Sequence, residues 1–202
     1  MGLNCSCPTG AAIPSIDTPE CKESLGQVQK VIFQRRGQTI ASADIKSLEQ
    51  MQALKSANNS TKIAVSPYIQ NPATEVGTAR TFGGGNQTLG GVEMIIGREA
   101  TKFTGVIYET AQSVVKQLKE MMCEDLGVYL IDENGNIACI NGEGSTSYSP
   151  IPVRSLFVGD KNLGGYEEPD SNAIEWSFLP NWSDDLAIIK QSDLDYNPLT
   201  EL

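Results

Sequence analysis

The segment from residue 107 to residue 140 constrains the fold most, because a helical pattern leads directly into a β-hairpin pattern. Its second half, GVYLIDENGNIACI, has β-favouring runs on both sides of Asn134 and Gly135, a pair that favours a type I′ turn. Its first half places apolar residues on one helical face: Ile107, Ala111, Val114, Val115, Leu118, Met121 and Met122. We predict a helix over residues 106–122 that packs on a sheet and buries Val114, Val115, Leu118 and Met122.

The other elements follow from shorter patterns. QVQKVIFQRR predicts a strand, and residues 42–57 predict a second helix, shorter than the first, with Ser42 as its cap. KIAVSPYIQ predicts an edge strand because it contains Pro67. Residues 73–97 predict two strands around a flexible glycine loop, and residues 151–159 and 173–190 supply further strands.

Together these elements predict an α+β fold with a mainly β core. We expect a sandwich or curled sheet with one flanking amphipathic helix, a shorter second helix and extended terminal arms. A chain of 202 residues suits one domain. We place an N-terminal arm at residues 1–27, which contain Pro8, Pro14 and Pro19, a single core at residues 28–190, and an acidic tail at residues 191–202.

Charge is divided unevenly along the chain. Residues 1–123 carry a balance of +2, whereas residues 124–202, with 15 acids and 3 bases, carry −12. This excess argues against binding a nucleic-acid backbone there, because phosphate contacts require Lys and Arg. Solubility alone explains it, and so does a surface that repels DNA or docks a basic partner. The candidates for such a surface are Asp160, Glu167, Glu168, Asp170 and Glu175.

Catalytic patterns are largely missing from the sequence. It contains no histidine, which excludes Ser-His-Asp, Cys-His and His-metal sites. No Lys-Ser/Thr follows the glycine stretch, as a phosphate loop requires, and Asp132, Asn134 and Asn136 lack the glycine and final Glu of a calcium loop. The five cysteines predict neither a disulfide framework nor zinc ligation. We therefore expect a protein that is not an enzyme and has no metal or other cofactor.

The N-terminus offers one alternative. No run approaches the length of a membrane span and no signal peptide is evident, so we expect synthesis in the cytosol and no membrane partner. Met1-Gly2-Leu3-Asn4-Cys5-Ser6, however, matches the myristoylation pattern, and Cys5 could take a second acyl chain. A lipid-anchored interaction protein therefore remains open, and intact-mass measurement would test it.

Two stretches carry a resemblance to a known family: SPYIQNPATEVGTARTFGGGNQTLGG and VKQLKEMMCEDLGVYLIDENGNI. With the long N-terminal arm, they resemble tail-tube and head-to-tail ring proteins of tailed bacteriophages, including those of crAss-like gut phages, over most of residues 28–190. The resemblance implies a virion protein made in the host cytoplasm. It also implies a homo-oligomeric ring in the tail or connector whose lumen conducts DNA, with neighbouring tail or connector proteins as partners and no catalytic residues.

Within such a ring, we expect loops to clasp neighbouring subunits, and the glycine insertion supplies the candidates: Gly83, Gly84, Gly85, Asn86, Gly90 and Gly91. The five acids named above would face the lumen or a basic neighbouring ring. A carbohydrate- or ligand-binding β-domain is the other alternative. It would use Trp176, Tyr166 and Trp182 as a sugar platform.

Overall fold

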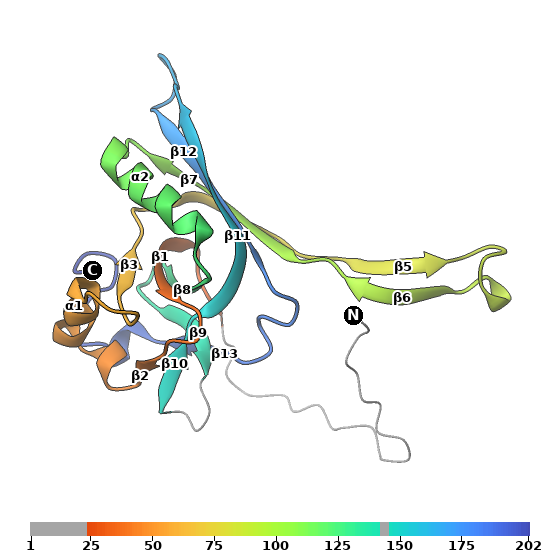
Figure 1. Ribbon diagram of the computed structural model, residues 1–202, viewed down its shortest axis with the longest axis horizontal. Helices are drawn as coiled ribbons and strands as arrows, with labels where there is room; N and C mark the ends of the chain where they lie inside the picture. Colours follow the sequence, from red (N-terminus) through yellow and green to blue (C-terminus); the bar gives the residue numbers. More distant parts are fainter. Residues whose placement is uncertain (1–23, 142–145) are drawn as a thin grey trace.

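The computed structural model describes residues 24–141 and 146–202, and these residues form the mainly β, α+β fold that the sequence predicts (Figure 1). Most strands join one antiparallel sheet of 11 strands, whose main path runs β2-β10-β9-β8-β11-β12-β7-β4. The strands of this path are β2 (Ile40–Ala41), β4 (Gln70–Glu75), β7 (Thr101–Tyr108), β8 (Leu126–Asp132), β9 (Ile137–Asn141), β10 (Ser147–Ser149), β11 (Ile151–Asn162) and β12 (Ser171–Phe178).

Three further strands pair off this path, and two form a separate hairpin. β1 (Val28–Arg35) pairs with β8 and with β3 (Ile63–Val65), and β13 (Leu186–Ile189) pairs with β9. β5 (Ala79–Gly83) and β6 (Glu93–Arg98) pair only with each other. The long strand β11 curls the sheet, because it pairs with β8 at Ile151–Pro152 and with β12 from Val153 onward.

The central strands β1 and β8 separate two hydrophobic cores. Val31 and Phe33 of β1 enter the first core, while Ile32 between them enters the second. The seven residues of β8 are all buried, because its side chains also alternate between the two cores. This double burial explains why VIF and LGVYLI are near-continuous apolar runs rather than alternating ones.

Helix α2 (Gln112–Glu120) packs across β11 on the first core, as predicted, and buries Val115 and Leu118. Val114 and Met122 are half-buried against the same core. The predicted start at residue 106 is wrong, because residues 101–108 form β7. Phe103, Gly105 and Ile107 are buried at every second position, so the apolar period there is that of a strand.

The second helix, α1 (Leu48–Ser56), is also shorter than predicted. A 3-10 turn at Asp44–Lys46 precedes it, so Ser42 does not cap the helix. Instead, the carboxylate of Asp195 accepts a hydrogen bond from the Leu48 amide at 2.8 Å. The helix start is therefore held by a residue far along the chain, and the acid suits the positive end of the helix dipole.

The β8–β9 hairpin is confirmed, but its turn is not the type I′ turn that Asn134–Gly135 favours. Gly135 has a positive φ of 81° and Asn134 does not. The Asp132 carboxylate accepts hydrogen bonds from the amides of Gly26, Asn134 and Asn136 and from the Asn136 side chain, at 2.8–3.0 Å. The aspartate therefore determines the turn, and it also fixes the point where the N-terminal segment joins the core.

Residues 191–202 do not form the extended tail that the sequence predicts. Leu194, Tyr196 and Leu202 are buried in the second core, and the Tyr196 hydroxyl donates to the Ile45 carbonyl at 3.0 Å. Lys30 donates to the Leu199 carbonyl at 2.6 Å. The segment thus closes the second core over α1. The predicted N-terminal arm lies outside the described residues except for residues 24–27.

Candidate assembly surface

The β5–β6 hairpin is the main candidate site because it projects from the body of the molecule (Figure 1). β4 and β7 pair in the main sheet, and beyond them the two chains continue outward as β5 and β6. At the root, the Glu99 amide donates to the Thr78 carbonyl at 2.8 Å, and the Thr78 hydroxyl donates to the Glu99 carboxylate at 2.9 Å. The hairpin is therefore a continuation of the β4–β7 pair rather than a separate unit.

Two further features fix the root. Arg98 donates a hydrogen bond to the Asn181 side chain, which ties the base of β6 to the loop before β13. Gly77 lies so close to the opposite chain that a Cβ there would approach the Glu99 carbonyl oxygen to 2.1 Å. The sequence thus needs glycine at this point to bring the two chains together.

Apolar side chains are exposed along the whole hairpin. Phe82 is opposite Met94 and Thr81 is opposite Ile95, and adjacent positions of a strand point to opposite faces. Both faces therefore carry exposed apolar groups. The exposed set is Phe82 (52%), Leu89 (101%), Val92 (66%), Met94 (55%), Ile95 (59%) and Ile96 (51%).

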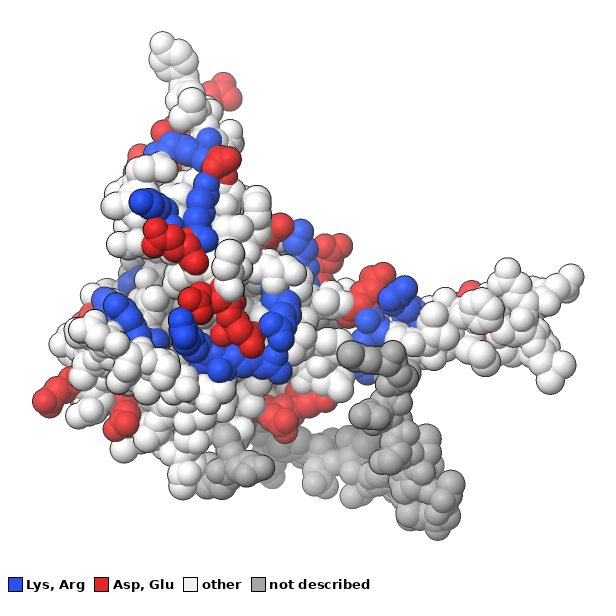
Figure 2. Space-filling view, viewed as in Figure 1, with Lys and Arg blue, Asp and Glu red and all other residues white. Residues whose placement is uncertain are grey.

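The β5–β6 hairpin lacks the contacts that normally stabilise a two-stranded hairpin in water. Two-stranded hairpins are marginal without a third strand or a packed face, and each strand here has one partner among the described residues. The outer edges of β5 and β6 present backbone groups that another strand can pair. The far half of the hairpin carries almost no charge, as its pale surface in Figure 2 shows. These properties are those of a protein–protein contact surface.

The glycine loop predicted as an inter-subunit loop forms the tip of this hairpin. Gly83, Gly84, Gly85, Gly90 and Gly91 all have positive φ, and Asn86 is exposed between them. The Thr88 hydroxyl accepts from the Gly84 amide at 3.2 Å and donates to the Val92 carbonyl at 2.6 Å. The tip is therefore a defined turn with its own hydrogen bonds, placed at the end farthest from the body.

The ribbon of β11 and β12 projects separately (Figure 1). The predicted acids lie on its two strands and their connection. Glu167 and Glu168 are exposed in its connecting loop, beside the fully exposed Tyr166. The other three acids have lysine partners: Asp160 pairs with Lys119, Asp170 with Lys161 at 3.8 Å and Glu175 with Lys102 at 2.8 Å. The hydrogen bond and charge of Lys119 lower the pKa of Asp160. The five acids are thus spread along the ribbon, and of these only Glu167 and Glu168 lack an ion pair within the described residues.

The charge excess of residues 124–202 is partly balanced in the fold. The described residues form five ion pairs, and in each of them the acid lies within residues 124–202. In three of the five the base lies within residues 1–123, at Arg35, Lys102 or Lys119. Asp132, a sixth acid, is buried and fully hydrogen-bonded. The sequence could not reveal this balance, because the pairing residues are as much as 89 positions apart.

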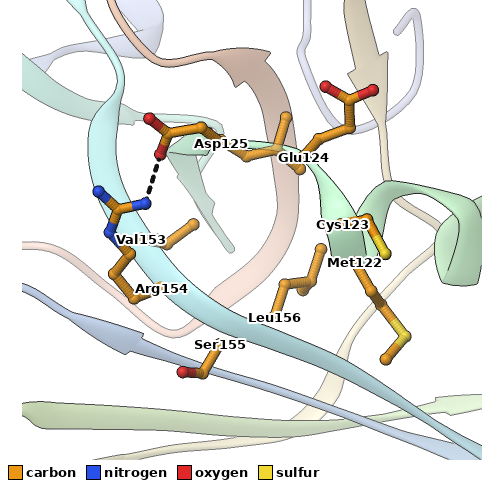
Figure 3. Close-up of a pocket in the computed structure, with 9 residues that line it drawn as sticks. Met122, Cys123, Glu124, Asp125, Val153, Arg154, Ser155 and Leu156 are labelled. Carbon is orange, nitrogen blue, oxygen red and sulfur yellow. Dashed lines mark hydrogen bonds and ion pairs between the residues drawn. The ribbon is translucent and has the colours of Figure 1, made fainter.

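A small pocket of about 260 Å³ beside the 3-10 turn at Met121–Cys123 shows no catalytic arrangement (Figure 3). The Arg154 guanidinium donates to the Asp125 carboxylate at 2.8 Å, so these two charges compensate each other. Cys123 and Ser155 also line the pocket, and the hydrogen bonds of the described residues include none from either side chain. Glu124 and Asp125, the carboxylates of this pocket, pair with Arg35 and Arg154, and neither is hydrogen-bonded to the Cys123 or Ser155 side chain as an activating base would be.

The described part of the chain has no group of three or more Cys, Asp or Glu side chains placed to hold a metal ion. Cys5, Cys7 and Cys21, like the acylation candidate Gly2, lie outside the described residues. Cys139 is in the second core, and burial raises the pKa of its thiol to about 12. Among the helices of residues 24–141 and 146–202, none has the length and apolar character needed to cross a bilayer.

The proposed sugar platform is wrong. Trp176 is 1% exposed and stacks on Phe103 in the first core, with ring centroids 4.2 Å apart. Trp182 is half-buried and stacks on Phe178 at 4.5 Å, whereas Tyr166 stands alone at the tip of the β11–β12 ribbon. The three rings therefore share no surface on which a sugar could stack.

Sequence reasoning predicted the two strands and the glycine loop between them, as the structure confirms with β5 and β6, but it did not predict that these strands expose apolar side chains. The signal was present in Glu93–Arg98, where Met94, Ile95 and Ile96 are consecutive. Consecutive apolar residues in a strand put apolar groups on both faces, and such a strand is stable only when both faces are covered. In the β5–β6 hairpin neither face is covered by other described residues.

The chain matches no protein-family model, and no curated protein matches it in sequence. Among solved structures it is similar to a chain from the tail of an empty GTA particle with C6 symmetry, at 12% identity and a TM-score of 0.34. The alignment covers 62% of this chain and 87% of that one. At this TM-score the likeness does not establish a shared fold.

Proposed function

We propose that this chain is a structural protein of a phage virion, which assembles into a homo-oligomeric ring or tube in the tail or head-to-tail connector. The observation that carries the proposal is the β5–β6 hairpin, whose apolar side chains and strand edges have no partner among the described residues. A projecting arm that contacts a different surface of an identical chain makes a head-to-tail interface, which forms a ring where the rotation between subunits closes and a helical tube where it does not. The role is structural rather than catalytic.

The same proposal gives the β11–β12 ribbon a task. DNA passing through a ring should meet a wall that does not bind phosphate, and acids provide this. Glu167 and Glu168 are the acids of the ribbon tip with no ion pair among the described residues, so we place them at the lumen or against a basic neighbouring ring. Asp160, Asp170 and Glu175 contribute less, because a lysine lies within 4 Å of each.

Assembly is tested with the full chain and a variant in which Asn-Gly replaces residues 79–98. Asn-Gly forms a two-residue turn, and the chains on either side are already hydrogen-bonded at Thr78 and Glu99. We expect rings or tubes of the full chain by electron microscopy and sedimentation, and only monomers of the variant. A full chain that stays monomeric at high concentration would refute the proposal.

The lumen assignment is tested by reversing Glu167 and Glu168 to Lys. Added Lys residues attract phosphates through salt-sensitive contacts, so the assembled variant should retain DNA at low salt and release it as salt is added. The matched control reverses Asp184 and Asp185, another adjacent and exposed acid pair, to Lys. Equal DNA binding by the two variants would place Glu167 and Glu168 on an ordinary outer surface.

A further inference from the structure

A groove of about 520 Å³ lies on the body of the protein, over the end of β1 and β3. Phe33 and Ala64, which are cross-strand partners on these strands, contribute to its floor. Met121 and Leu126 line it beside the 3-10 turn, and residues 58–60 line it from the α1–β3 connection. The Ala64 side chain is a single methyl group, so it leaves an apolar hollow in the groove that a side chain from another molecule can fill.

The rim of the groove is charged, and one of its charges has no counterpart. Arg35 and Glu124 pair with each other at 2.9 Å. Lys62 is exposed at the rim, and the ion pairs of the described residues do not include it. An occupant with apolar side chains and one acid would therefore complement the groove in both shape and charge.

The outer half of the hairpin has this composition. Ile95 is exposed opposite Thr81, and Glu93, two positions before it on β6, points to the same face. Glu93 is exposed and is also outside the ion pairs of residues 24–141 and 146–202. Arg80 and Arg98 are nearer the root, so the outer half carries Glu93 as its one charge.

The hairpin cannot reach the groove of its own chain. Figure 1 shows β3 on one side of the body and the β5–β6 hairpin extending from the opposite side. A contact between them therefore joins two copies. It is a head-to-tail contact between different surfaces, which repeats around a ring until the ring closes.

We infer that the outer half of the hairpin seats in this groove of a neighbouring copy, with Ile95 over Ala64 and with Glu93, on the same face as Ile95, beside Lys62. The inference rests on the ring assembly proposed above and names its contact surface. The seated hairpin covers one of its apolar faces and supplies Lys62 with a partner at the interface rim. Two copies need not insert hairpins into each other, because each subunit can place its hairpin in one neighbour and accept the hairpin of another.

The test is a charge exchange in the full chain, followed by sedimentation. Glu93→Lys places two cations side by side and should raise the concentration needed for assembly about ten-fold or more, as should Lys62→Glu. The double variant Glu93→Lys/Lys62→Glu should recover most of the loss. Each single variant should melt at the wild-type temperature, because both residues are exposed in the monomer.

A second variant fills the groove without changing charge. Ala64→Trp should abolish assembly, whereas Ala53→Trp, on the exposed side of α1, should assemble normally. Flotation with phosphatidylcholine vesicles tests lipid as the other occupant of the apolar hairpin. If wild-type protein assembles but neither the charge exchange nor Ala64→Trp alters assembly, the groove assignment is overturned and the ring remains. Hairpin-dependent binding to vesicles would also overturn it, and a wild-type chain that never assembles overturns both proposals.

Discussion

The ribbon β11–β12 and the hairpin β5–β6 both project from the same body, yet the apolar side chains of strands β12 and β6 have opposite environments. β12 has a strand on each side, β11 and β7, and buries Ile174, Trp176 and Phe178. Within the described ranges β6 pairs with β5 alone, and Met94, Ile95 and Ile96 are exposed. The apolar side chains of β12 are therefore covered within their own chain. The apolar residues of β6 are uncovered in the described part of the chain, and in the assembly proposed above another molecule covers them.

The comparison predicts that folding stability depends on the body and not on the hairpin. Trp176→Ala should lower the free energy of unfolding by about 3–5 kcal/mol, because it opens a cavity among Phe33, Phe103 and Phe178. Urea unfolding of dilute, monomeric protein measures this. Tyr166→Ala, at the exposed tip of the same ribbon, should change stability by no more than about 0.5 kcal/mol. If Trp176→Ala and Tyr166→Ala lower the free energy of unfolding by similar amounts, the buried part of the ribbon is no more important for stability than its exposed tip, contrary to this prediction.

A smaller loss is expected at Asp132, which holds the β8–β9 turn and Gly26. Asp132→Asn replaces a carboxylate that accepts four hydrogen bonds by an amide whose NH₂ group faces donors. The free energy of unfolding should fall by about 1–3 kcal/mol, the cost of leaving buried polar groups unsatisfied. Glu133→Gln, the adjacent and exposed acid, is the control and should unfold like wild type in urea.

The Asp132 effect should also depend on pH. Burial alone would raise the pKa of this carboxyl, but the hydrogen bonds from Asn136, Gly26 and Asn134 outweigh it and hold the pKa below its usual value. A carboxyl with a depressed pKa stabilises the fold above its unfolded-state pKa, and this contribution is lost as pH falls through the folded-state value. The difference in unfolding free energy between wild type and Asp132→Asn should therefore narrow below about pH 4. If the difference in unfolding free energy between the two proteins stays constant down to pH 2, the effect of Asp132→Asn comes from shape rather than from charge.

Local patterns predicted most of the body. The β8–β9 hairpin was evident from β-favouring runs around Asn134–Gly135, and α2 from the spacing of Val115 and Leu118. The start of that helix was misplaced because Ile107 fits both periods. It precedes Ala111 by four residues, which is a helical spacing. It also follows Phe103 and Gly105 at every second position, which is the spacing of the strand that it forms.

Long-range features were not predictable from the sequence. Leu194, Tyr196 and Leu202 are scattered among polar residues, so no period marks the C-terminal segment as part of the second core. The pairing of Glu175 with Lys102 depends on β12 lying beside β7, which charge counting along the chain cannot show. For the candidate assembly surface, sequence reasoning found the two strands and their glycine tip but not the exposure of Met94–Ile96, because that exposure depends on which strands pair beside β5 and β6 in the fold.

The smallest expected effect on stability is the sharpest test of the comparison. Phe82→Ser with Ile95→Ser removes one exposed apolar group from each face of the hairpin, where neither is packed in the monomer. The free energy of unfolding of the monomer should change by no more than about 0.5 kcal/mol. Assembly measured by sedimentation should nevertheless be lost, because apolar groups at the centre of a contact carry most of its free energy. Ile174→Ser on β12 is the matched variant, with a large loss of stability from a similar chemical change. If the hairpin variant unfolds as readily as Ile174→Ser, the hairpin packs within its own chain and its exposure is not an assembly feature; if it keeps both stability and assembly, the hairpin serves neither.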